Sequence, residues 1–106
     1  MTLVIPAADC RSMEDVRHQI DRIDRALVGL LAERQTYIER AALLKPSRDT
    51  VHDDARIEDV VAKVLAEAKR QGLSPAIAEP VWRELIARSI ALEFKAFDRK
   101  AQSRKA

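Results

Sequence analysis

The longest regular pattern of apolar positions in this sequence runs from Ser12 to Lys45. Apolar residues recur there at alternating spacings of four and three, and the stretch contains no proline and only one glycine, Gly29. This period is typical of one long amphipathic helix whose apolar side chains share a single seam. The seam consists of Val16, Ile20, Ile23, Leu27, Leu30, Tyr37, Ala41 and Leu44.

The length of this helix bears on assembly. A helix over residues 12–45 would be about 50 Å long, whereas a compact globule of about 100 residues has a radius of gyration of only about 13 Å. The helix would therefore extend beyond the core that one chain of 106 residues can form. Its apolar seam predicts a partner, most simply a second copy of the same chain.

Local signals set the ends of the predicted helices. Ser12 with Asp15 resembles a capping box at the start of the first helix, and the Lys45-Pro46 step ends it because the residue before proline resists helical geometry. A polar connection over 46–50 follows. The second helix is predicted from Val51 or His52 to Gln71, with Asp53 and Asp54 in its first turn and Gly72 as its stop.

Ser74 and Pro75 are typical of the start of a third helix. Pro80 is awkward inside a helix because it lacks a backbone donor, so we expect a kink there, or a short turn before a main helix over about 79–100. The predicted architecture is all-α, with three helices per chain. The predicted divisions are a leader over 1–11, a helical domain over 12–100 and a flexible tail over 101–106.

Composition fits this class. Hydrophobic residues make up 47%, charged residues 34% and aromatic residues 4%, and the net charge is +2, without the basic stripe that nucleic-acid binding requires. The final cations are predicted to be a frayed, solvated tail; they are Arg99, Lys100, Arg104 and Lys105. One cysteine excludes an internal disulfide, and neither a signal peptide nor a membrane-spanning run is visible. We therefore expect a cytoplasmic protein.

The candidate chemistry rests on cations along the apolar faces. No metal-ligand spacing, Ser/His/Asp arrangement or phosphate loop is visible, whereas Arg34 occupies a position where the seam calls for an apolar residue. Lys45 follows eleven residues later on nearly the same side of the helix, so both could reach one small anion. Arg17 lies about 25 Å from Arg34 along the helix and could join that site only from a partner chain. From spacing alone, ordinary solvated or salt-bridged charges remain the simpler explanation, except at Arg34, since a buried guanidinium needs a partner or a ligand.

These residues carry a resemblance to a known family. Arg17-x2-Ile20-Asp21-x-Ile23-Asp24-x2-Leu27-x2-Leu30-Leu31-x2-Arg34, followed by Lys45, Val51-x-Asp53-x2-Arg56 and Ser89-x3-Glu93, is similar to the all-helical chorismate mutases. The resemblance covers roughly residues 13–96. It implies an interlocked homodimer with two sites, each completed by one arginine from the partner's long helix.

The resemblance also implies roles for individual residues in binding the dicarboxylate substrate. Arg34 and the partner subunit's Arg17 would bind the two carboxylates of chorismate, and Lys45 and Glu93 would flank its ether oxygen. The remaining positions implied by the resemblance are Asp53 and Arg56 near the entry and Ser89 near the ring carboxylate. The Claisen rearrangement of chorismate to prephenate needs no cofactor, metal or nucleophile; the protein holds the reactive conformer and stabilises developing charge.

The sequence departs from the family at two positions. Ile57 stands where a substrate-contacting Glu is common, and Glu93 stands where Gln is common. An ionised Glu93 cannot donate to the ether oxygen, so the implied role requires a protonated side chain and an activity that falls as pH rises. The sequence also resembles isochorismate pyruvate lyase in the short connection after Lys45, the Asp9-Cys10 leader and Ile57. That activity is therefore an alternative. A non-catalytic dimeric helical module is a further alternative, although a plain coiled coil would place an apolar residue at position 34.

Overall fold

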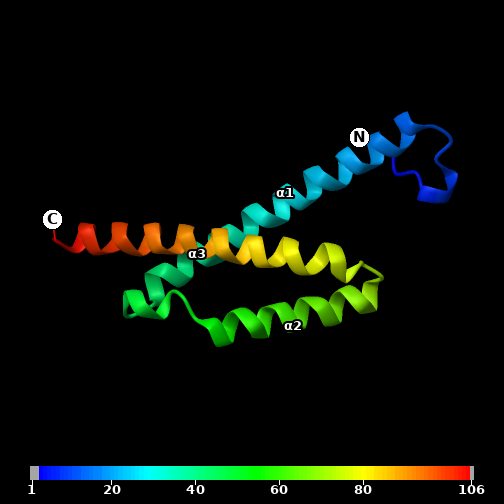
Figure 1. Ribbon diagram of the computed structural model, residues 1–106. Helices are drawn as coiled ribbons and strands as arrows, with labels where there is room; N and C mark the ends of the chain where they lie inside the picture. Colours follow the sequence, from blue (N-terminus) through cyan, green and yellow to red (C-terminus); the bar gives the residue numbers. More distant parts are fainter. Residues whose placement is uncertain (1–2, 106) are drawn as a thin grey trace. The chain divides into compact units, whose positions relative to one another are not determined.

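Three α-helices make up most of the chain. The computed structural model describes the backbone of residues 3–105 and the side chains of residues 3–103. The helices are α1 (Met13–Leu44), α2 (Asp54–Gln71) and α3 (Pro75–Lys105), with 3-10 turns η1 (Ala7–Asp9) and η2 (Arg48–Thr50) before α1 and α2 (Figure 1). Residues 3–105 contain no strand. The predicted all-α class, with three helices and a long first helix, is confirmed.

The ends of α1 follow the local signals. The Ser12 hydroxyl oxygen accepts a hydrogen bond from the Asp15 backbone N–H at 3.1 Å, and the Asp15 carboxylate accepts one from the Arg11 N–H at 3.0 Å. This reciprocal pair satisfies two backbone donors at the helix start, where intrahelical acceptors are absent. The helix ends at Leu44, just before the Lys45-Pro46 step. With 32 residues, α1 is about 48 Å long.

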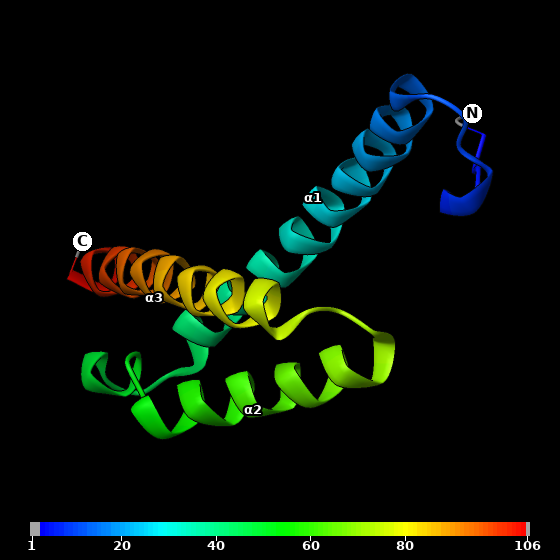
Figure 2. The ribbon, with the colours of Figure 1, turned by 45° about the vertical axis from the view of Figure 1, so that its right-hand side comes forward.

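The second and third helices pack along each other. In both Figure 1 and Figure 2, α2 runs beside the N-terminal half of α3, and the C-terminal half of α3 continues past the start of α2. Gly72 makes the reversal possible because its φ of 80° lies in the left-handed region, and its N–H donates to the Ala68 carbonyl. The buried apolar side chains on these two helices are Val61, Ala68, Ala78 and Ile86.

One predicted boundary was wrong, and one of the two alternatives for the third helix is excluded. The second helix begins at Asp54 rather than at Val51 or His52, because η2 occupies 48–50 and the Asp53 carboxylate caps the helix by accepting from the Arg56 N–H. The third helix is one unbroken element with Pro80 inside it, so no separate turn precedes a main helix. Pro80 cannot donate to the Ala76 carbonyl, so α3 lacks one helical hydrogen bond near its N-terminus but continues through it.

The chain forms two compact units that divide between Thr36 and Tyr37. In the first unit the leader folds back on α1. The Gln19 side-chain amide holds the leader there by donating to the Leu3 carbonyl at 2.8 Å. The apolar seam of α1 stays open to solvent, with Ile20 51%, Leu27 49% and Leu30 62% exposed. Within the described residues, no helix is long and apolar enough to cross a membrane.

Candidate active site

The second unit brings together two of the predicted site residues. The Lys45 ammonium donates to the Glu93 carboxylate with an Nζ–Oε2 distance of 2.7 Å. The Glu93 side chain is only 6% exposed, while Lys45 remains 30% exposed. A carboxylate buried to this extent needs a cation or hydrogen-bond donors to compensate for its lost hydration. The pair therefore holds the Lys45 ammonium at one defined place, with part of its surface accessible to a ligand.

Local structure explains why Lys45 can reach α3. The helical path stops at Leu44, and the Lys45 N–H still donates to the Ala41 carbonyl at 3.0 Å. Lys45 is thus fixed as the last residue tied to α1, and the proline after it turns the chain away. Its side chain is anchored to α3 across 48 residues of sequence.

A cation that the sequence placed in a frayed tail belongs to this region. The prediction of a solvated cluster was wrong for Lys100, because its ammonium donates to the carbonyls of Ala42 and Lys45, each at 2.9 Å. The ammonium also lies over the Phe97 ring, 4.2 Å from its centroid. The α3 helix continues to Lys105, past the expected end at Lys100. The connection after Lys45 is tied to the same helix by Arg48, whose guanidinium donates to Asp98 at 3.1 Å.

Sequence reasoning missed Lys100 because local composition alone suggests a polar end. A usable signal was present: Lys100 follows Glu93 by seven residues, which places both on nearly one face of a helix. Phe97, between them in sequence, supplies an aromatic ring that a cation can pack against.

The residues predicted for the entry, Asp53 and Arg56, lie at the start of α2, and Ser89, predicted near the ring carboxylate, lies on α3. All three are engaged locally. Asp53 caps α2. The Arg56 guanidinium donates to Asp59 at 2.8 Å, and Lys63 donates to the same carboxylate at 2.9 Å. The hydrogen bond from Lys63, followed by that from Arg56, lowers the pKa of Asp59. The Ser89 hydroxyl donates to the Leu85 carbonyl at 2.7 Å, a local bond common for serine inside helices.

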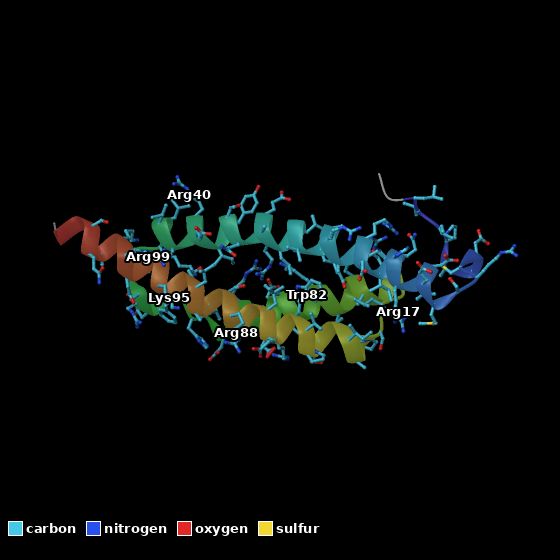
Figure 3. All side chains as sticks on the ribbon, turned by 90° about the horizontal axis from the view of Figure 1, so that it is seen from above. Arg17, Arg40, Trp82, Arg88, Lys95 and Arg99 are labelled. Carbon is cyan, nitrogen blue, oxygen red and sulfur yellow. The ribbon has the colours of Figure 1, made fainter. Side chains whose placement is uncertain are left out.

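The two predicted arginines of the long helix lie in the first unit. Arg17 is exposed near the start of α1 (Figure 3), and Arg34 is half-buried. Their grouping with Lys45 and Glu93 stays a prediction. Among the side chains of the described residues, no three His, Cys, Asp or Glu lie together in a way that could hold a metal ion.

Comparison with known protein families matches residues 16–94 to "Chorismate mutase type II". The match spans most of the chain. The chain belongs to this family. The matched range includes both members of the Lys45–Glu93 pair and ends just after Glu93, so Lys100 and Asp98 lie outside it. The family resemblance noted in the sequence is confirmed.

A comparison with curated proteins adds a relative with a defined activity. The chain is 29% identical over 87 residues to "Isochorismate pyruvate lyase" of Pseudomonas aeruginosa, covering 82% of this chain and 86% of the relative. The chain is therefore a member of the chorismate mutase type II family that is also similar to a lyase.

Proposed function

We propose that the protein is a chorismate mutase, which rearranges chorismate to prephenate. The observation that carries the proposal is the Lys45–Glu93 pair, an accessible ammonium held at 2.7 Å by a buried carboxylate in a chain of this family. Family membership supports a substrate with two carboxylates and an ether oxygen. The pair offers that oxygen a fixed hydrogen-bond donor.

The reaction explains why such a donor matters. As the rearrangement proceeds, the C–O bond of the ether breaks while a C–C bond forms, and negative charge develops on the ether oxygen. A preorganised ammonium at that oxygen stabilises the transition state more than the ground state. Lys45 would supply this hydrogen bond, and Glu93 would hold its ammonium in place.

The two carboxylates of the substrate need their own partners. We assign them to Arg34 and to the partner subunit's Arg17, in a homodimer formed through the apolar seam of α1. The exposure of Ile20, Leu27 and Leu30 supports a partner, because each leaves about half of its apolar surface in water. Guanidinium groups suit this task since they bind a carboxylate through two parallel hydrogen bonds. Arg56 would stay near the entry, where Asp59 orients it.

One observation favours a second activity. The similarity to an isochorismate pyruvate lyase covers most of both chains. Elimination of pyruvate from isochorismate to leave salicylate also breaks a C–O bond in a dianion of similar shape. A cationic pocket with a donor at the departing oxygen would serve either reaction, so the lyase activity is our second candidate.

Parallel assays separate the two candidates. Purified protein is incubated with chorismate or with isochorismate, and prephenate, salicylate and pyruvate are measured. The mutase proposal expects prephenate formation with the higher kcat/KM, and a decrease of at least ~100-fold in Arg34→Ala and in Lys45→Met. A higher kcat/KM for salicylate formation from isochorismate than for prephenate formation would refute the mutase proposal in favour of the lyase. Turnover of neither substrate by the folded protein would refute both activities.

The matched control is Lys63→Met. Lys63 also pairs with a carboxylate, but its side chain is 70% exposed and its partner Asp59 is 46% exposed. Removing this ammonium changes the net charge by the same amount as Lys45→Met. Its kcat/KM should stay within about twofold of the unmodified protein, because exposed ion pairs contribute little.

A further inference from the structure

The carboxyl end of α1 lacks a cap of its own. The last four carbonyls of an α-helix have no intrahelical donor, and the proline that follows Lys45 has no N–H to offer them. Cations near this end would be favourable because of the helix dipole, yet the last turn of α1 contains no basic residue. The stabilising cation must come from elsewhere in the chain.

Lys100 supplies it from α3. Its ammonium lies 2.9 Å from the carbonyl oxygens of Ala42 and Lys45 and 3.4 Å from that of Leu43. An ammonium has three N–H donors, so one side chain can serve these three carbonyls. The nearby Phe97 ring, 4.2 Å from the ammonium, restricts where the flexible lysine chain can go.

This places Lys45 between two contacts from one helix. Its backbone carbonyl accepts from Lys100, and its side-chain ammonium donates to Glu93. Seven residues separate Glu93 from Lys100, which corresponds to about 10 Å along α3 on nearly one face. The main chain and the side chain of Lys45 are thus both held by hydrogen bonds to α3.

We propose that Lys100 is a positioning residue for Lys45. The proposal rests on the function assigned above, in which the Lys45 ammonium touches the reacting oxygen. Lys100 does not touch the substrate; it fixes the backbone from which Lys45 extends. Because Lys100 lies beyond the residues matched to the family, 16–94, this device belongs to the C-terminal part of α3 in this chain. Positioning errors of about 1 Å can cost up to ~100-fold in rate.

A second tie to α3 is weaker. Arg48 donates to Asp98, but the two side chains are 61% and 49% exposed. Exposed ion pairs contribute little to stability. The Arg48 guanidinium also lies 4.4 Å from the Phe94 ring centroid, which keeps the connection near α3 without contacting Lys45. Lys100 is therefore the side chain to test.

The first test variant is Lys100→Met, which replaces the ammonium by an apolar side chain of similar length. The second is Lys100→Gln, which retains N–H donors without the charge and is used if the Met variant folds poorly. Lys95→Met is the matched control, since Lys95 is an exposed cation on the same stretch of α3 (Figure 3). Each variant is first checked for helicity by far-UV circular dichroism. Steady-state kinetics with chorismate then gives kcat and KM separately.

A positioning role expects a particular kinetic pattern. Lys100→Met should lower kcat by about tenfold with KM changed by less than about twofold, and Lys100→Gln should fall between it and the unmodified protein. Lys95→Met should match the unmodified protein. Equal kcat in Lys100→Met and Lys95→Met would overturn the proposal, as would a loss confined to KM.

Hydrogen exchange provides a readout that does not depend on turnover. The Lys45 N–H is bonded to the Ala41 carbonyl. This bond should open more often when Lys100 is removed, so exchange of the Lys45 amide should accelerate at least ~5-fold. If the unmodified protein does not turn over chorismate, this result still decides whether Lys100 holds the carboxyl end of α1. Faster exchange with unchanged kcat would refute positioning, and unchanged exchange would refute the contact itself.

Discussion

Removing the Lys45 ammonium should destabilise the fold by leaving a buried carboxylate without its cation. In the unmodified protein the Glu93 side chain is only 6% exposed and that of Lys45 is 30% exposed. Breaking a fully buried pair costs about 3–5 kcal/mol, and breaking an exposed pair about 0–1 kcal/mol. Because this pair is mostly but not fully buried, we expect Lys45→Met to lower the free energy of unfolding by about 2–3 kcal/mol.

The partner substitution should have a smaller effect. Glu93→Gln keeps an acceptor oxygen for Lys45, whose ammonium can also be hydrated because it is partly exposed. We expect a loss of about 1 kcal/mol. In the double variant no uncompensated carboxylate remains, so its loss should be smaller than the sum of the two single losses by about 1–2 kcal/mol. Such a coupling is typical of side chains in direct contact.

Urea unfolding followed by far-UV circular dichroism measures these differences. All variants must be compared at one protein concentration, because unfolding of an oligomer depends on concentration. Lys63→Met, which removes a cation from an exposed pair, should change the free energy of unfolding by less than about 1 kcal/mol. If Lys45→Met were as stable as Lys63→Met and the double variant were additive, the Lys45–Glu93 pair would not exist in solution.

Two further predictions follow from the site and the fold. Arg17→Ala and Arg34→Ala should each be inactive alone, but mixing them should restore about a quarter of the activity, because half of the dimers are mixed and each has one intact site. No recovery after subunit exchange would refute a site shared between two subunits. Gly72→Ala should lower the free energy of unfolding by about 1 kcal/mol, because the φ of 80° at this position is unfavourable for a residue with a Cβ. The added Cβ itself would meet no atom within 4 Å. An unchanged urea midpoint would show that this turn adopts another conformation.

Several features were determined locally and could be read from the sequence. The start of α1 depends on Ser12 and Asp15, its end on Pro46, and the end of α2 on Gly72. Each of these signals acts over three or four residues, through a side chain bonded to nearby backbone or through a restricted φ. The family was recognised from a resemblance, because the order of Arg17, Arg34, Lys45, Arg56 and Glu93 along the chain is itself a property of the sequence.

Where local signals conflicted, the tertiary context decided. Pro80 argues for a break in α3, yet the helix continues through it, because the missing bond lies near the capped N-terminus and Ala78 and Ile86 are buried on either side. The cations at the end of the chain look like a solvated tail. Lys100 instead lies beside the carboxyl end of α1, and no local pattern records that neighbour.

The sequence by itself determined three helices, the long apolar seam and the set of candidate cations. Only the tertiary structure decided that Lys45 meets Glu93 across 48 residues and that Lys100 meets Ala42 across 58. The physical reason is that a helix period specifies which residues share a face but not which face of another helix it meets. That choice depends on how the packed helices end and turn, and it is made here where α1 stops beside the C-terminal half of α3.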